Sequence, residues 1–305
     1  MPTMVLKLVA FISVMSALSL DDAVASTTLT FREQSDALPK TVRSDRMRAV
    51  YLMGLEGVGH HYIRSAIANA SRDSPHRITS ASAWEYGCQT SMSGNVSRYL
   101  QSFHLSREQM QGFTWEEKGL RDGQTMIVYF GKYISYPYLG GSDKVFQYTD
   151  LRMLAEAAEE EGVDLRIVYL KRSASDLVIA DTIHRDFPNH LGGQTNLSFE
   201  ERFVEYLKIL FTDMSVVHSS LGELDPAFVV CHDYDALGDP SQASRIANFI
   251  SPNEEMAQLI ESSLMDSAHE GHHDANSGLP FEGASVIVDR MQRKLDSFER
   301  TYCGH

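Results

Sequence analysis

The sequence predicts an α/β fold of three layers, in which helices flank a central parallel sheet on both faces. Short apolar runs of strand length occur at residues 49–53, 124–130, 165–170 and 227–231. Segments with helical periodicity separate these runs, and a strand–helix–strand order favours parallel strands. A glycine-containing turn follows the first run. The 305 residues suffice for one large domain of this kind or for two small ones.

The turn after the first strand has the composition of an anion-binding loop. Gly54, Gly57 and Gly59 precede a helical pattern that begins near His60. Glycine allows close approach of the backbone to an anion, and the start of a helix supplies outward N–H groups and a positive dipole end. The spacing of Gly54 and Gly59 fits the first half of the nucleotide P-loop pattern, so the predicted fold is P-loop-like. An alternative interpretation is a joint whose glycines serve packing alone.

The second half of the P-loop pattern is missing. His60 and His61 stand where that pattern needs Lys and Ser or Thr. The hydroxyl that would hold magnesium is therefore absent. This disfavours a magnesium-dependent nucleotide enzyme and leaves anion binding by the backbone open.

The N-terminal segment is expected to direct the chain into the secretory pathway. Lys7 precedes an apolar run over residues 8–20, and Ala23-Val-Ala25 offers a small-residue cleavage pattern. A membrane anchor over residues 4–20 and a buried helix are the alternatives to a cleaved signal peptide. The predicted organisation is a signal peptide or anchor at 1–25, a polar stem at 26–45, and an α/β domain at 46–305 with an insertion at 71–122.

The expected destination is the Golgi lumen or the cell exterior, and three glycosylation triplets agree with it: Asn69-Ala-Ser, Asn95-Val-Ser and Asn196-Leu-Ser. An oxidising compartment favours one disulfide among the three cysteines. Cys231 ends an apolar run and is expected to be buried. We therefore predict a bond between Cys88 and Cys303.

The net charge of the chain limits the classes of ligand that it is expected to bind. The formal net charge of −14 argues against a nucleic-acid groove or an anionic membrane surface as the main partner. A local anionic ligand remains compatible with it. The cysteines show no metal-binding spacing, and the His269–Asp274 tract is interpreted as an exposed polar loop, so no metal site and no specific protein partner are predicted.

Three segments, in this order, resemble the sulfotransferases that use 3′-phosphoadenosine 5′-phosphosulfate. In the first, the family has a basic residue, Ser-Gly and two Ser or Thr, and this chain has Gly57-Val58-Gly59-His60-His61, which keeps only the central glycine. In the second, the strand ending at Leu170 leads to Arg172 and Asp176, which match the family's strand-Arg-x-Pro-x-Asp pattern. Ala180 replaces the family's serine, with Thr182 nearby.

The third segment runs from Val229 to Pro240. It is similar to the family's strand followed by Tyr-Glu-Asp-Leu and a proline-headed step into a helix. That helix ends in the family with Phe-Ile or Phe-Leu, as at Phe249-Ile250 here.

The resemblance implies transfer of a sulfuryl group from the phosphosulfate donor, a co-substrate, to a hydroxyl or amine of a glycan or small metabolite. Such a transfer depends on positioning and on stabilising negative charge. The residues that it implies for donor binding are Gly57, Val58, Gly59, His60, His61, Arg172, Ser173 and Thr182. His60 or His61 would replace the lost basic residue, Lys132 is the other candidate cation, and Arg172 would clamp the 3′-phosphate.

The remaining assignments stay open. The general base could be Glu56, Glu85 or His104. Arg172 could instead pair with a nearby aspartate, and Lys132 could simply be solvated. Three basic residues near the C-terminus could close over a nucleotide or form a solvated helix face: Arg290, Arg293 and Lys294.

Two other functions compete with sulfuryl transfer. A sulfotransferase-fold protein could bind an anionic nucleotide or glycan without catalysis, which the lost lysine and serine favour. A P-loop kinase is disfavoured by the missing Lys and Ser or Thr.

Overall fold

The computed structural model describes residues 38–54, 58–72, 74–80, 90–91, 96–131, 147–148, 150–177, 218–268 and 284–303. The expected signal segment at 1–25 lies outside these ranges. None of the helices within them combines the length and the apolar character needed to cross a membrane.

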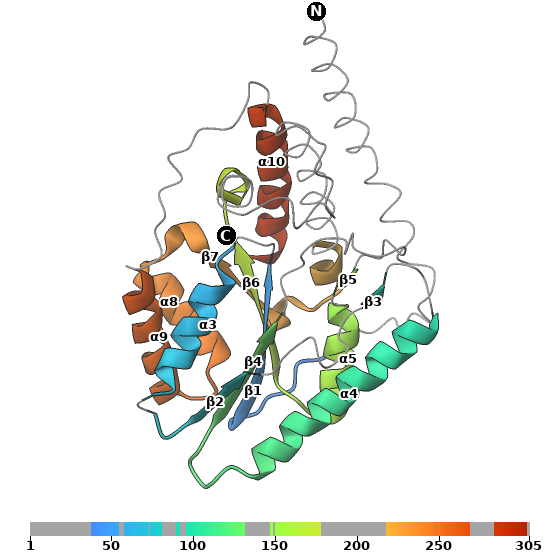
Figure 1. Cartoon of the computed structure of the whole chain (residues 1–305), viewed down its shortest axis with the longest axis vertical. Helices are drawn as coiled ribbons and strands as arrows, with labels where there is room; N and C mark the ends of the chain where they lie inside the picture. The colour runs from blue at the N-terminus through green and yellow to red at the C-terminus, as the bar shows by residue number, and fades with distance from the viewer. Residues whose placement is uncertain are drawn as a thin grey trace, which may run out of the picture.

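Five parallel strands form the central sheet in the spatial order β2-β4-β1-β6-β7 (Figure 1). Their bounds are β1 Met47–Gly54, β2 Arg77–Ser80, β4 Met126–Gly131, β6 Leu165–Lys171 and β7 Val229–Asp233. Two further strands, β3 Thr90–Ser91 and β5 Gln147–Tyr148, form a separate antiparallel pair.

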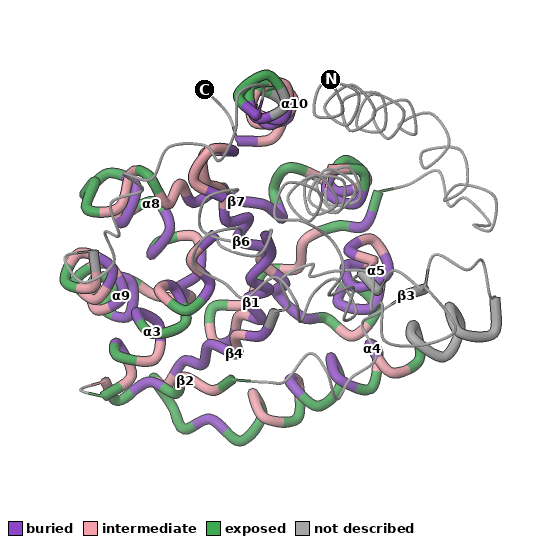
Figure 2. The backbone as a smooth tube through the Cα atoms, turned by 45° about the horizontal axis from the view of Figure 1, so that its top comes forward, coloured by how far each residue is buried: buried purple, intermediate pink, exposed green. Residues whose placement is uncertain are grey.

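Helices cover both faces of this sheet, so the predicted three-layer α/β fold is confirmed (Figure 2). The helices α3, α8 and α9 lie on one face, and α4, α5 and α10 lie on the other. The helical bounds are α3 His60–Ala70, α4 Val96–Lys118, α5 Leu151–Glu161, α8 Pro240–Ile250, α9 Glu254–Ala268, α10 Ala284–Tyr302, and the 3-10 turns η2 Pro226–Phe228 and η3 Tyr234–Ala236.

Local sequence signals explain several of the helix boundaries. The Asp150 side chain accepts the N–H of Met153 at 2.9 Å and caps α5. Gly162 ends the same helix with a φ of 72°, a left-handed conformation that glycine adopts without a steric cost. Asp239 caps α8, and Pro240 occupies its first turn, where the missing N–H costs nothing.

The segment expected as an insertion, residues 71–122, contributes two strands and a helix. The strand β2 forms the edge of the main sheet next to β4. Within this segment, α4 is one continuous helix over Val96–Lys118. The buried Ser106 and Gln109 put polar residues on its packed face and obscure its apolar period.

Part of the expected polar stem packs on the domain. The N–H of Lys40 donates to Glu159 on α5 at 3.0 Å, and the Ser44 hydroxyl donates to Glu117 on α4 at 3.1 Å. Residues 38–45 therefore run along the helices of one face instead of leading away from them.

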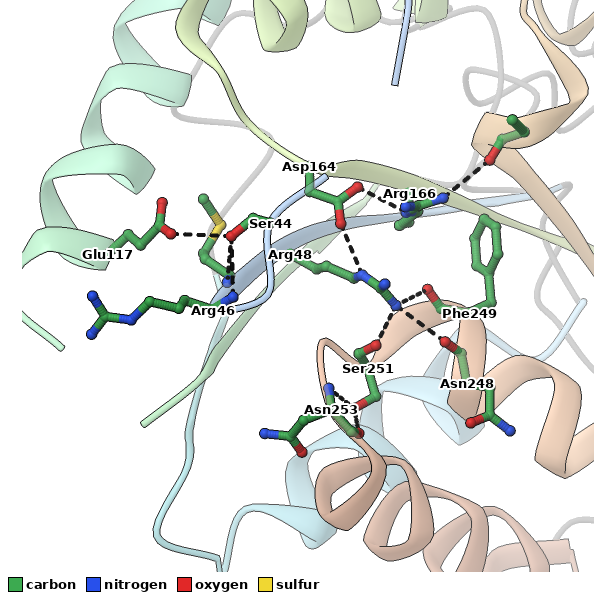
Figure 3. Close-up of polar contacts among 12 residues, drawn as sticks. Ser44, Arg46, Arg48, Glu117, Asp164, Arg166, Asn248, Phe249, Ser251 and Asn253 are labelled. Carbon is green, nitrogen blue, oxygen red and sulfur yellow. Dashed lines mark hydrogen bonds and ion pairs between the residues drawn. The ribbon is translucent and has the colours of Figure 1, made fainter. Parts of the chain in front are cut away.

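One arginine ties the amino end of the sheet to the helices behind it (Figure 3). Arg48 on β1 donates Nε–H to the fully buried Asp164 at 2.9 Å. Its Nη1 donates to carbonyl groups at the C-terminal end of α8 and just beyond it: Asn248, Phe249 and Ser251. Arg166 Nε lies 2.9 Å from the other oxygen of Asp164. A buried carboxylate is thus balanced by two guanidinium groups, one of which also satisfies helix-end carbonyls.

A disulfide joins Cys231 to Cys303, with a Cα–Cα distance of 5.3 Å. The predicted Cys88–Cys303 bond is therefore wrong. Cys231 is buried, as expected, but it faces the end of α10, so burial does not exclude it from pairing. Tyr169 and Phe298, whose ring centroids are 5.5 Å apart, add an aromatic contact between β6 and the same helix.

The strand order identifies one edge of the sheet as the place for a ligand. The chain passes from β1 to β2 on one side of β1 and later to β6 on its other side. In open α/β sheets, ligands bind beyond the carboxyl ends of strands where the winding direction changes. That point lies beyond β1 and its neighbour β6.

Candidate functional site

The turn between β1 and α3 is built as an outward-facing helix start. Gly59 has a φ of 90°, a conformation that favours glycine. Gly59 also has no side chain to cap α3, so the first N–H groups of the helix point out of its end. A Cβ at Gly54 would lie 2.7 Å from the carbonyl oxygen of Leu170, so β1 and β6 also require glycine where the turn begins.

The two histidines of this turn face different ways, because adjacent positions on an α-helix point about 100° apart. His60 is 8% exposed, whereas the His61 side chain is exposed to solvent. Val58 is buried against the core. The buried His60 and the exposed His61 thus lie at the same end of α3 on different sides of the helix. An anion at this helix end would contact one of the two rings.

The end of β6 places Arg172 and Ser173 at the same edge of the sheet. Because β1 and β6 pair directly, with Gly54 opposite Leu170, the glycine turn and Arg172 follow neighbouring strands. The Ser173 hydroxyl donates to Asp176 at 2.8 Å, and its N–H donates to Asp235 at 2.8 Å. Both polar groups of Ser173 are therefore engaged within the chain.

Tyr234, which follows β7, connects these two segments. Its ring lies against the turn so closely that a Cβ on Gly59 would be 2.3 Å from it. The guanidinium carbon of Arg172 lies 4.6 Å from the centroid of the same ring. This cation–π geometry holds Arg172 beside the start of α3. Tyr62, in the first turn of α3, meets Tyr234 edge-on with a centroid distance of 6.5 Å.

Neither Tyr234 nor Asp235 was among the predicted site residues. Both lie in the Val229–Pro240 segment whose resemblance to the sulfotransferases was noted, so that similarity was the available signal. This segment lies at the site because β7 pairs with β6, with Lys171 opposite Asp233. The pairing of two strands about 60 residues apart in the chain could not be read from either strand alone.

Lys171, the neighbour of Arg172, has a structural role. Its ammonium lies 3.0 Å from Asp233 and 3.0 Å from Glu299 on α10. Burial alone would lower the pKa of Lys171, but hydrogen bonds to these two carboxylates outweigh it and raise that pKa. Lys171 therefore links β6, β7 and α10.

Asp235 carries a carboxylate in an unfavourable position. Partial burial raises the pKa of Asp235, and repulsion from Asp176 and Asp233 adds to that rise. The hydrogen bond from the Ser173 N–H and the charge of Arg172 act in the opposite direction without reversing it. The edge of the sheet thus combines an anion-attracting arginine with a carboxylate that opposes an anion.

The flank of α10 that reaches the end of β6 is polar and acidic. Gln292 accepts the N–H of Ala174 at 2.8 Å, and Glu299 pairs with Lys171. Of the basic residues proposed to close over a nucleotide, Arg293 is exposed. Burial is the larger cause that lowers the pKa of His218, and the charge of Lys294 lowers that pKa further.

Several predicted residues lie outside the described part of the chain: Glu56, Gly57, Lys132, Thr182, Glu85 and the His269–Asp274 tract. The third candidate base, His104, is exposed on α4 and lies 3.3 Å from Glu108 on the same helix. Among the described residues, no group of three or more His, Cys, Asp or Glu side chains is arranged to hold a metal ion.

Comparison with known proteins leaves the family open. No protein-family model matches the sequence, and no curated protein matches it. A mouse sulfotransferase, SULT7A1, whose structure is a complex with PAP, aligns over 92% of each chain at 13% identity with a TM-score of 0.40. The structure of APE1195 aligns over 57% of this chain and 99% of its own, at 17% identity and a TM-score of 0.26. Similarity at this level assigns neither a family nor an activity.

Proposed function

We propose that this protein is a sulfotransferase that moves a sulfuryl group from 3′-phosphoadenosine 5′-phosphosulfate to a hydroxyl or amine of a glycan or small metabolite. One observation carries the proposal: the Tyr234 ring packs on both the Gly59 turn and the Arg172 guanidinium. A helix start and an arginine, each suited to an anion, are thereby fixed beside each other at the sheet edge.

In this proposal each group has a distinct task. The start of α3 and one of the two histidines would bind the 5′ end of the donor, and Arg172 would bind its 3′-phosphate. The acceptor oxygen or nitrogen attacks sulfur, the bond from sulfur to the bridging phosphate oxygen breaks, and the acceptor proton passes to a base. The leaving group is adenosine 3′,5′-bisphosphate. The proposed location is the secretory pathway, on the evidence of the composition of residues 1–25.

A second function, nucleotide or glycan binding without catalysis, is favoured by a specific observation. The Lys171 ammonium forms ion pairs with Asp233 and Glu299, and the negative charge of Asp235 interacts with Arg172. The described part of the site therefore offers less positive charge to a sulfuryl transition state than the number of its basic residues implies.

The first test is calorimetric binding of adenosine 3′,5′-bisphosphate to the full chain. We expect Arg172→Ala to weaken binding about tenfold or more, a loss of about 1.4 kcal/mol or more. Arg72→Ala is the matched control, because Arg72 is exposed just beyond the opposite end of α3. Equal weakening in both variants, or no binding by the unmodified chain, would contradict the proposed donor site.

Turnover separates the two functions. The unmodified chain is incubated with the phosphosulfate donor and a panel of hydroxylated glycans and small phenols, and the released bisphosphate is measured. Release that depends on the acceptor supports the transferase. Donor binding without release on any acceptor supports the non-catalytic function, and preferential binding of magnesium ATP would point to a kinase.

A further inference from the structure

The site contains an anionic group of its own at the place where an anionic ligand would bind. Asp235 Oδ2 accepts the N–H of Ser173 at 2.8 Å, and its charge interacts with Arg172. A backbone N–H and a guanidinium are the groups that a phosphate or sulfate oxygen would use. The Asp235 carboxylate therefore occupies the position of a ligand oxygen.

The backbone of Asp235 is fixed while its side chain reaches solvent. The N–H of Asp235 donates to Asp233 at 3.0 Å, and Asp233 is itself held by Lys171 at 3.0 Å. Lys171 pairs with Asp233 at the ends of β6 and β7, and the turn η3, which contains Asp235, follows β7 directly. The pairing thus brings this turn beside Ser173, and the exposed Asp235 side chain can rotate away from it.

Nearby charges make this position costly for a carboxylate. Partial burial is the largest cause that raises the pKa of Asp235, and repulsion from Asp176 and Asp233 raises it further. A residue held against such repulsion is easier to displace than one surrounded only by cations. The contact with Ser173 is therefore suited to exchange with an incoming anion.

We propose that Asp235 is a specificity-determining residue of this site, which competes with bound anions for the Ser173 N–H and for Arg172. The proposal rests on the proposed function, since it concerns the same anion site. A single small anion that displaces Asp235 has no second anionic group with which to gain further binding energy. A nucleoside bisphosphate can offset that displacement through its second anionic group at the start of α3. Asp235 thus favours ligands with two separated anionic groups over free phosphate or sulfate.

The test compares two ligands and two matched variants in the full chain. Asp235→Asn keeps one oxygen that can accept the Ser173 N–H, removes the charge, and replaces the second carboxylate oxygen with an NH2 group. Asp266→Asn makes the same charge change on an exposed residue of α9. Calorimetry measures binding of inorganic sulfate and of adenosine 3′,5′-bisphosphate, and thermal melting checks that each variant is folded.

We expect Asp235→Asn to bind sulfate at least tenfold more tightly than the unmodified chain, and to bind the bisphosphate more tightly by a smaller factor. The preference for the bisphosphate over sulfate should therefore fall in this variant and stay unchanged in Asp266→Asn.

Other outcomes overturn the inference in distinguishable ways. Equal affinities in all three proteins would reject the role of Asp235 and leave the proposed donor site standing. Weaker bisphosphate binding in Asp235→Asn would identify Asp235 as a ligand contact and reject competition. An absence of bisphosphate binding in every protein, Asp235→Asn included, would reject the inference and the proposed function together.

Discussion

Arg48 is predicted to be among the most important single side chains for stability. It makes four hydrogen bonds, one to Asp164 and three to carbonyl oxygens at the end of α8. The Asp164 side chain is 0% exposed and that of Arg48 is 17% exposed. Replacing Arg48 by alanine leaves a buried carboxylate with Arg166 as its remaining cation and strips the donor from the helix-end carbonyls.

The expected cost follows from this geometry. Removing one partner of a buried ion pair costs about 3–5 kcal/mol. The partial exposure of Arg48 lets water reach some of the carbonyls, so the low end applies, about 3 kcal/mol. That is a large part of the roughly 5–15 kcal/mol that stabilises a typical domain. Arg48→Lys keeps the charge but loses the fork of donors, so its cost should be intermediate, about 1–2 kcal/mol.

Denaturant unfolding followed by circular dichroism measures these differences, provided that the m-value is unchanged. Arg46→Ala is the matched control, because the Arg46 guanidinium donates to the backbone carbonyls of Leu120 and Arg121, whereas that of Arg48 pairs with the buried Asp164. It should cost about 1 kcal/mol or less. Equal losses for Arg46→Ala and Arg48→Ala would refute the reasoning, since burial of Asp164 would then contribute nothing.

Three further predictions concern the turn, the disulfide and a buried histidine. Gly59→Ala should lower the unfolding free energy by about 2–5 kcal/mol, from left-handed strain and from the Tyr234 ring; in a Tyr234→Ala background the loss should shrink to the strain alone, about 1–2 kcal/mol. Cys303→Ser should lower the free energy of unfolding by about 2–5 kcal/mol, and reduction with a thiol should have the same effect on the unmodified chain but none on the variant. Burial lowers the pKa of His232 from 6.5 to about 4, so the folded state resists a proton that the unfolded state accepts. Stability should therefore fall as the pH drops from 6.5 toward 4, and His232→Phe should show a shallower fall in that window, whereas parallel slopes would exclude His232 as the cause.

The parts of the fold that depend on local chemistry could be predicted from the sequence. The strand at 165–170 is a continuous apolar run, and α5 is bounded by Asp150 and Gly162. Gly59 was singled out by its spacing from Gly54, and the structure gives it the positive φ that such a turn needs. In each case the deciding residues lie within a few positions of the feature that they determine.

The parts that depend on distant residues could not be predicted. Tyr234 lies on the Gly59 turn only because β7 pairs beside β6, and β6 beside β1. Cys231 was set aside because it ends an apolar run, yet the strand face that it occupies is where α10 ends. The carboxylate of Asp235 beside Arg172 has the same origin, since the pairing of β7 with β6 brings the turn after β7 beside the end of β6.

The most direct test of a donor site at this sheet edge is a crystal structure of the chain with adenosine 3′,5′-bisphosphate. We predict one phosphate within about 3 Å of the Arg172 guanidinium and the other at the N–H groups that begin α3. Asp235 should then have left the Ser173 N–H. A bisphosphate bound elsewhere, with Asp235 still accepting from Ser173, would contradict the account.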